Sequence, residues 1–113
     1  MKLLGSGADP DNGRAFLMWQ DGGFEFRQNT LLYVGATIPM HSHEYAHDYL
    51  LGPGVYSLVA EHPDGTAEPE RRILREGERG HVPARHKHHF TLIEWGGSEG
   101  WVRCYWPEGA DRG

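Results

Sequence analysis

The sequence predicts an all-β protein, a small β-barrel or jelly roll folded as a single domain. Three observations support this prediction. The 113 residues include 16 glycines and 7 prolines, which divide the chain into short segments. Several of these segments alternate apolar and polar residues or are rich in β-formers, and none repeats apolar residues with a helical period. Roughly nine short strands at this spacing are typical of a barrel or jelly roll.

The expected strands follow one another along the chain, with turn signals between them. Residues 1–14 are expected to be a loose N-terminal segment, because residues 5–13 are rich in glycine, aspartate and asparagine. The barrel is expected to span residues 15–106, and the polar residues 107–113 to form a C-terminal tail. The expected strands are residues 15–19, 24–28, 31–38, 47–51, 55–60, 72–75, 88–95 and 101–106. Turns are expected where glycine, proline and aspartate gather, at residues 20–23, 52–54, 62–65, 76–78 and 96–100.

Seven of the eight histidines lie in two clusters, and this is the most informative feature of the chain. The clusters are His41, His43 and His47, and then His81, His86, His88 and His89. Neutral imidazole is the commonest protein ligand for zinc, iron, copper and nickel. In a strand, His41 and His43 project from the same face because side chains alternate. Two such ligands could hold one ion, provided that the fold brings the second cluster to the first.

The two clusters resemble the two sequence motifs of the cupin superfamily. The first cupin motif reads G-x5-H-x-H-x3-4-E-x6-G, and here Gly35, His41, His43 and Gly54 fit it, with His47 in the glutamate position. The second motif reads G-x5-P-x-G-x2-H-x3-N. The matching residues of this sequence are Gly77, Pro83 and His88. The resemblance covers residues 35–92, about half of the chain, and implies a cupin-type jelly-roll β-barrel.

Two departures from the cupin motifs affect the expected site. With His47 in the glutamate position, the resemblance implies an all-histidine metal site. Asp48 is the alternative fourth ligand, because the family allows four residues before this position as well as three, although the spacing to Gly54 favours His47. Arg85 occupies the second motif's glycine position, so the turn before the second-motif histidine could be built differently. The expected metal ligands are His41, His43, His47 and His88.

Strand alternation predicts which other side chains share the site. If the ligands face inward, Tyr33 and Tyr49 face the same way on the first-motif strands, and Asp48 faces outward. On the second-motif strand, Phe90 and Glu94 share a face with the expected histidine ligand. The three aromatic residues are expected either to line a substrate pocket or to be barrel core, and Glu94 is a candidate general base. The implied pocket suits a small, mostly apolar ligand.

The resemblance implies one divalent transition metal (iron, zinc or nickel) and two kinds of chemistry. Iron would suit a dioxygenase, as in three-histidine cupin dioxygenases. Zinc or nickel would suit a cyclase or isomerase, as in four-histidine monocupins. The alternatives are a non-catalytic cupin that binds a small molecule or a metal, and a cupin that has lost its metal and uses its histidines as hydrogen-bonding groups. The resemblance also implies a homodimer.

Composition limits the partners and the expected location of the protein. The formal net charge of −5 argues against a nucleic-acid-binding protein, because such proteins usually carry a basic stripe. The start of the chain lacks the apolar stretch of a signal peptide, and no run approaches the ~18 apolar residues of a membrane span. The protein is therefore expected to be cytoplasmic, to bind a small molecule and to contact neither nucleic acid nor membrane.

Overall fold

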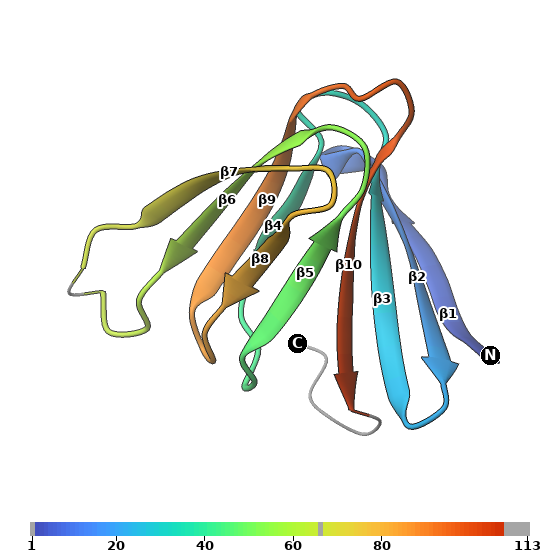
Figure 1. The fold of residues 1–113 in the computed structure, drawn as a ribbon, viewed down its shortest axis with the longest axis horizontal. Coiled ribbons are helices and arrows are strands. Elements are labelled where there is room, and N and C mark those ends of the chain that lie inside the picture. The colour runs from blue at the N-terminus through green and yellow to red at the C-terminus, as the bar shows by residue number, and fades with distance from the viewer. Residues whose placement is uncertain (1, 66, 108–113) are drawn as a thin grey trace.

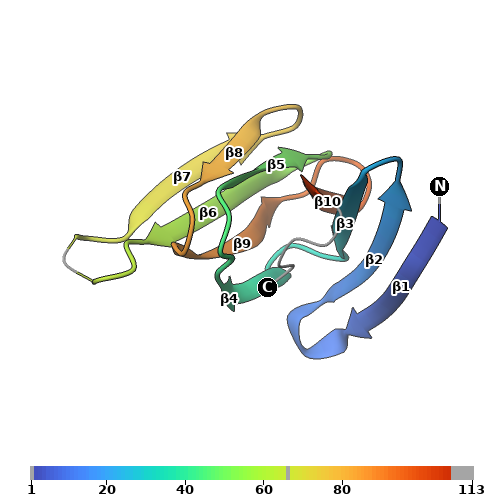
Figure 2. The same cartoon turned by 90° about the horizontal axis from the view of Figure 1, so that it is seen from below.

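The computed structural model describes residues 2–65 and 67–107 and consists of two antiparallel β-sheets packed face to face (Figures 1 and 2). One sheet has the order β1-β2-β3-β10-β5-β8, and the other has the order β4-β9-β6-β7. The predicted all-β jelly-roll barrel is confirmed. Besides the short 3-10 helix Pro10–Asn12, the elements are β1 Lys2–Asp9, β2 Arg14–Asp21, β3 Phe24–Leu31, β4 Thr37–His41, β5 His47–Leu51, β6 Val55–Glu61, β7 Glu70–Arg75, β8 Arg79–Val82, β9 Lys87–Glu94 and β10 Gly100–Pro107. Within the described ranges, no helix is long and apolar enough to cross a membrane.

The core lies between the two sheets, because alternate residues of the central strands point inward. In β5 the buried positions are His47, Tyr49 and Leu51, whereas Asp48 is exposed. In β9 the buried positions include His88 and Phe90. The apolar part of this core includes Leu31, Leu51, Leu58, Phe90, Leu92 and Val102. The histidines of both motifs therefore stand on the same inward faces as the core, which is what the alternation predicted.

The prediction that residues 1–14 form a loose N-terminal segment is wrong for the residues of this range that the structure describes. Residues 2–9 form β1, which pairs with β2 from Lys2 opposite Gln20 to Asp9 opposite Arg14. β1 is an edge strand whose side chains are exposed or half-buried, so it lacks the apolar alternation that reveals a strand in a sequence. Backbone pairing holds it instead. The expected tail begins at Pro107, which is the last residue of β10, and its remaining residues lie outside the described ranges.

The turn before β9 joins the two histidine motifs directly. Arg85 has a φ of 64°, and among the described residues it is the non-glycine residue with a positive φ. It therefore adopts the left-handed conformation in which the cupin motif places glycine. Its backbone N–H donates a hydrogen bond to the carbonyl oxygen of His43 at 2.7 Å. The turn keeps the geometry that the motif requires, although an arginine builds it.

Candidate metal centre

The fold brings histidines from both motifs to one place. His41 at the end of β4 pairs with His88 on β9, and their ring centroids lie 4.3 Å apart. His43 lies in the connection between β4 and β5 and is buried. Ligand nitrogens of His41, His43 and His88 all lie within 4.8 Å of one another. We call these three residues the histidine triad. The prediction that the two clusters meet is confirmed.

Backbone carbonyls orient the imidazole rings. The Nδ1 atoms of His41 and His88 lie 2.7 and 2.8 Å from the carbonyl oxygens of the residues two positions earlier, Pro39 and His86. Nδ1 of His47 lies 2.8 Å from the equivalent carbonyl oxygen, that of Tyr45. Because a carbonyl oxygen only accepts, each Nδ1 carries the hydrogen, and each Nε2 of a neutral ring presents a lone pair. This arrangement is typical of histidines that bind a metal through Nε2.

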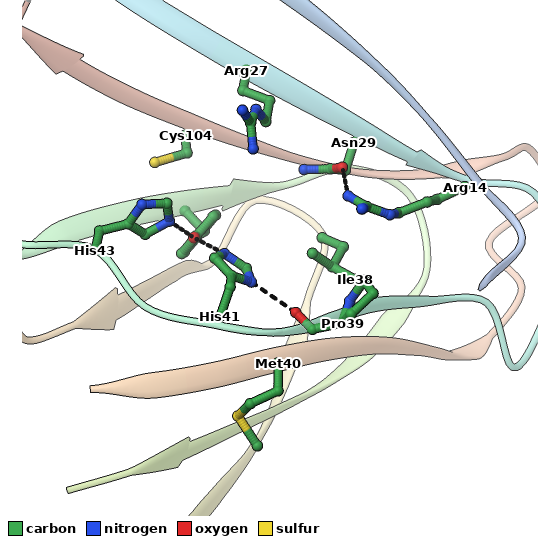
Figure 3. Close-up of a pocket in the computed structure, with 10 residues that line it drawn as sticks. Arg14, Arg27, Asn29, Ile38, Pro39, Met40, His41, His43 and Cys104 are labelled. Atoms are coloured by element: carbon green, nitrogen blue, oxygen red, sulfur yellow. Dashed lines mark hydrogen bonds between the residues drawn. The ribbon is translucent and has the colours of Figure 1, made fainter. Parts of the chain in front are cut away.

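The hydroxyl of Tyr49 lies where these lone pairs converge. Its oxygen is 2.8 Å from Nε2 of His88, 2.9 Å from Nε2 of His47, and 3.3 Å from Nε2 of both His41 and His43. Figure 3 shows the rings of His41 and His43 turned toward one another. A hydroxyl has one proton, so it can satisfy only one of the converging nitrogens. The other nitrogen lone pairs face the hydroxyl oxygen with no proton between them. A divalent cation at this point could bind several of these nitrogens at once. The donor set therefore fits a metal ion.

Burial keeps all of these groups in the neutral state. Burial lowers the pKa of His43 to about 3 and the pKa of His88 to about 4. It also lowers the pKa values of His41 and His47. Burial raises the pKa of Tyr49 well above its ordinary value, so the phenol keeps its proton at neutral pH. Neutral imidazole is the form that binds a metal, so no proton has to leave the histidines first.

The structure distinguishes the two candidates for the fourth ligand. Asp48 faces away from the site on the outer side of β5, where its carboxylate lies 2.7 Å from Nδ1 of His81. His47 faces the site and contacts the Tyr49 hydroxyl, but its nitrogen lies outside the group of three within 4.8 Å. Asp48 is therefore not a ligand, and His47 as a fourth ligand stays a prediction.

A cavity of about 240 Å³ opens beside the histidine triad. Its lining comes from β2, β3, β4, β5, β10 and the connection after β4, and consists of Arg14, Arg27, Asn29, Ile38, Pro39, Met40, His41, His43, Tyr49 and Cys104. Figure 3 shows Arg14, Arg27 and Asn29 on one side of this cavity and His41 and His43 on the other. Tyr49 lines the cavity, and its role in binding a substrate stays a prediction.

The other predicted pocket residues lie elsewhere. Phe90 is fully buried beneath Tyr49, with the ring centroids 4.8 Å apart, and belongs to the core. Tyr33 is 50% exposed in the connection between β3 and β4, where its ring lies against Gly13. The alternation that predicted an inward Tyr33 fails because β3 ends at Leu31, before this residue.

Glu94, the predicted general base, is also misplaced. It is exposed at the last position of β9. Alternation fixes which face a residue shares, but not its depth along the strand. Glu94 lies six positions after His88, and at ~3.3 Å per residue this puts it about 20 Å along the strand from the triad. It cannot exchange a proton with a ligand held there.

Sequence reasoning missed the polar wall of the cavity. Arg27 and Asn29 project inward from β3, which begins with the alternating apolar and polar residues Phe-Glu-Phe-Arg. Phe26 instead packs on the other side of the sheet, with its ring centroid 5.0 Å from that of Trp19 and 5.2 Å from that of Tyr105. The alternation of apolar and polar residues in this segment therefore comes from an aromatic cluster on the outer face and not from the core. The expected apolar pocket is wrong on this side, because the wall carries two guanidinium groups.

Comparison with solved structures identifies the fold, whereas no family model and no curated protein matches the sequence. An oxalate oxidase superposes with a TM-score of 0.70 at 20% identity, over 93% of this chain and 56% of its own. The Bacillus subtilis oxalate decarboxylase OxdC, which is described with Mn(II) centers, gives 0.76 at 13% identity, over 96% and 28% of the two chains. KdgF from Halomonas sp. gives 0.65 at 17% identity, over 89% and 84%.

The chain spans about half the length of the oxalate oxidase and about a quarter of OxdC. At these identities the likeness concerns the fold, and a fold does not determine a function. Together with the two motifs and the histidine triad, the superpositions identify this chain as a protein with the cupin fold.

Proposed function

We propose that this protein is a metal-dependent enzyme that acts on a small molecule in the cavity beside the histidine triad. The observation that supports this most strongly is the convergence of imidazole lone pairs on one point, where a single hydroxyl proton cannot satisfy them. The bound ion would supply a Lewis acid with open coordination positions. Iron would suit a dioxygenase, and zinc or nickel would suit a cyclase or isomerase. The structures with similar folds add manganese to the candidates.

The residues of the chain have separate roles in this proposal. His41, His43 and His88 would hold the ion, and the carbonyls of Pro39 and His86 keep two of the rings correctly turned. The small cavity limits the size of the substrate. At about 240 Å³ it is below the ~300–1,000 Å³ of typical ligand pockets, so we expect a small metabolite.

Tyr49 is the group beside the triad that could hold a proton for the reaction. Its hydroxyl keeps the proton because burial raises its pKa. Once the ion occupies the imidazole lone pairs, the O–H loses its present acceptors and can donate to a ligand in the cavity. Glu94, the predicted general base, is about 20 Å away along β9. The proton-transfer group that we propose instead is Tyr49, acting as a proton donor. The expected homodimer and cytoplasmic location stay predictions.

Metal content tests the first part of the proposal. Protein stripped with EDTA and reloaded with iron(II), zinc, nickel or manganese should bind close to one ion per chain. His88→Ala should bind much less, because it removes one ligand of the triad. His62→Ala is the matched control, since His62 is exposed and contacts Asp64 in a turn. Full metal content in His88→Ala would overturn the proposal.

Turnover tests the second part. The iron(II) form should consume oxygen, or the zinc or nickel form should isomerise a compound, when challenged with a panel of small carbonyl compounds. Tyr49→Phe should retain the metal and lose turnover, if the hydroxyl donates a proton. A metal-loaded protein that binds members of the panel and converts none of them would instead indicate a non-catalytic binding module.

A further inference from the structure

We propose that the cavity binds a small carboxylate, with Arg27 as its main anchor and Arg14 as a second, oriented cation. This inference rests on the proposed function in one respect: the bound acid would lie between the two arginines and the ion held by the triad. Neither cupin motif contains these arginines, which lie on β2 and β3, outside residues 35–92.

The two arginines reach the cavity from neighbouring strands of the six-stranded sheet. β2 and β3 pair along their whole length, with Arg14 opposite Leu31 and Met18 opposite Arg27. Both guanidinium groups line the same cavity as His41 and His43, and Figure 3 shows them facing these histidines across it. A ligand in the cavity therefore lies between two cations on one side and the imidazoles on the other.

Neighbouring groups hold the Arg14 guanidinium in place and contact that of Arg27, whose Nη2 donates to Sδ of Met18 at 3.5 Å. Arg14 donates from Nε to Asp9 at 3.0 Å and from Nη1 to Asn29 at 2.8 Å. Its Cζ lies 5.6 Å from the ring centroid of Phe16, and Cζ of Arg27 lies 5.8 Å from the same centroid. One aromatic ring thus supports both cations. Because two hydrogen bonds already hold Arg14, an anion would lose little free energy in positioning this side chain.

The charge around the cavity is positive. Its described lining contains two arginines and no aspartate or glutamate. Asp9 offsets part of the Arg14 charge from outside the lining, and Glu25 lies buried two residues before Arg27 on the same strand. Burial raises the pKa values of Tyr49 and Cys104, and the Arg27 charge opposes this rise at both groups. The charge of Arg27 therefore acts on two groups of the cavity lining, Tyr49 and Cys104.

The shape and chemistry of the cavity favour a carboxylate. A guanidinium group binds a planar carboxylate with two parallel hydrogen bonds, and it also binds phosphate in this way. Ile38 and Pro39 give the cavity an apolar wall that suits a short carbon skeleton. A cavity of about 240 Å³ leaves room for a small acid. We therefore expect a monocarboxylate of a few carbons rather than a free phosphate.

Calorimetric titration of the zinc-loaded protein tests this inference. The probes are two- to six-carbon monocarboxylates, the neutral amide of each, and inorganic phosphate. At least one acid should bind about tenfold or more tightly than its amide, the range expected for hydrogen bonds to a charged partner. Arg27→Gln should weaken this acid about tenfold or more, and Arg27→Lys should weaken it less. Arg103→Gln is the matched control, because Arg103 contacts Gln28 and the Trp101 ring and does not line the cavity.

Three results would overturn the inference: acids and amides that bind equally, an Arg27→Gln variant that keeps the wild-type affinity, or phosphate that binds more tightly than every acid. Metal content measured on the same samples separates this inference from the proposed function. Loss of acid selectivity with full metal content contradicts only the carboxylate site. If the wild type binds no metal, the proposed function fails, and the same titrations on metal-free protein still test the arginine anchor.

Discussion

The hydroxyl of Tyr49 should stabilise the metal-free protein and compete with the metal. In the metal-free state it satisfies one buried imidazole nitrogen, and its closest partners are His88 at 2.8 Å and His47 at 2.9 Å. Tyr49→Phe leaves that buried acceptor unsatisfied, which costs about 1–3 kcal/mol. In the metal-bound state the ion occupies the nitrogens, so the same substitution should cost much less. The stabilisation that the metal provides should therefore grow by about 1–3 kcal/mol, a roughly 5- to 150-fold tighter apparent affinity.

Urea unfolding in EDTA and in saturating zinc measures both states. Tyr56→Phe is the matched control, because the Tyr56 hydroxyl is buried, donates to the carbonyl of Pro53 at 2.8 Å and lies away from the histidines. That control should lower the free energy of unfolding equally with and without zinc. If Tyr49→Phe destabilises the zinc form more than the metal-free form, the hydroxyl is a metal ligand. If the metal-free form is unaffected, the converging lone pairs do not need it, and the argument for the site fails.

Three further predictions concern acid, the fourth ligand and the motif turn. The unfolded chain takes up histidine protons near pH ~6.5, whereas the folded pKa values of His43 and His88 are about 3 and about 4. The free energy of unfolding of the metal-free protein should therefore be at its full value above pH ~6.5. It should fall toward pH ~4 by about 1.4 kcal/mol per pH unit for each of these histidines, as measured by urea unfolding in EDTA. A flat profile from pH ~6.5 to pH ~5 would contradict this prediction. His47→Ala should reduce the metal content of purified protein and Asp48→Ala should leave it unchanged, and the reverse result would mean that the register of β5 is wrong. Arg85→Gly should raise the thermal midpoint, because it removes the backbone strain of a left-handed arginine and so adds up to about 1 kcal/mol to the free energy of unfolding. A lower midpoint would show that contacts of the arginine side chain outweigh this strain.

The meeting of the two histidine clusters could be predicted because the clusters resemble the two cupin motifs. Strand alternation alone left open whether the fold brings them together. Alternation correctly predicted the buried faces of β5 and β9. It does not apply to His43, because β4 ends at His41. The same rule correctly placed Asp48 on the outer face, where it contacts His81. The burial of these strand faces depends only on local period and on a core that excludes water.

The rest depended on information that period alone does not carry. Alternation cannot give the distance along a strand, so Glu94 was assigned to a site about 20 Å away. It also cannot tell an outer aromatic cluster from a core, so the inward-facing Arg27 and Asn29 of β3 were missed. β1 was missed because an exposed edge strand is held by backbone hydrogen bonds to β2 rather than by buried side chains.

The central claim is that one metal ion binds between the two histidine motifs. The most direct test is a crystal structure of the zinc- or iron-loaded protein, with anomalous data collected at the metal absorption edge. The account predicts one anomalous peak bonded to Nε2 of His41, His43 and His88 at about 2.0–2.2 Å, the usual length of a metal–nitrogen bond. A peak elsewhere would contradict the account. So would metal-saturated crystals without a peak, in which the Tyr49 hydroxyl still lies among the histidine nitrogens.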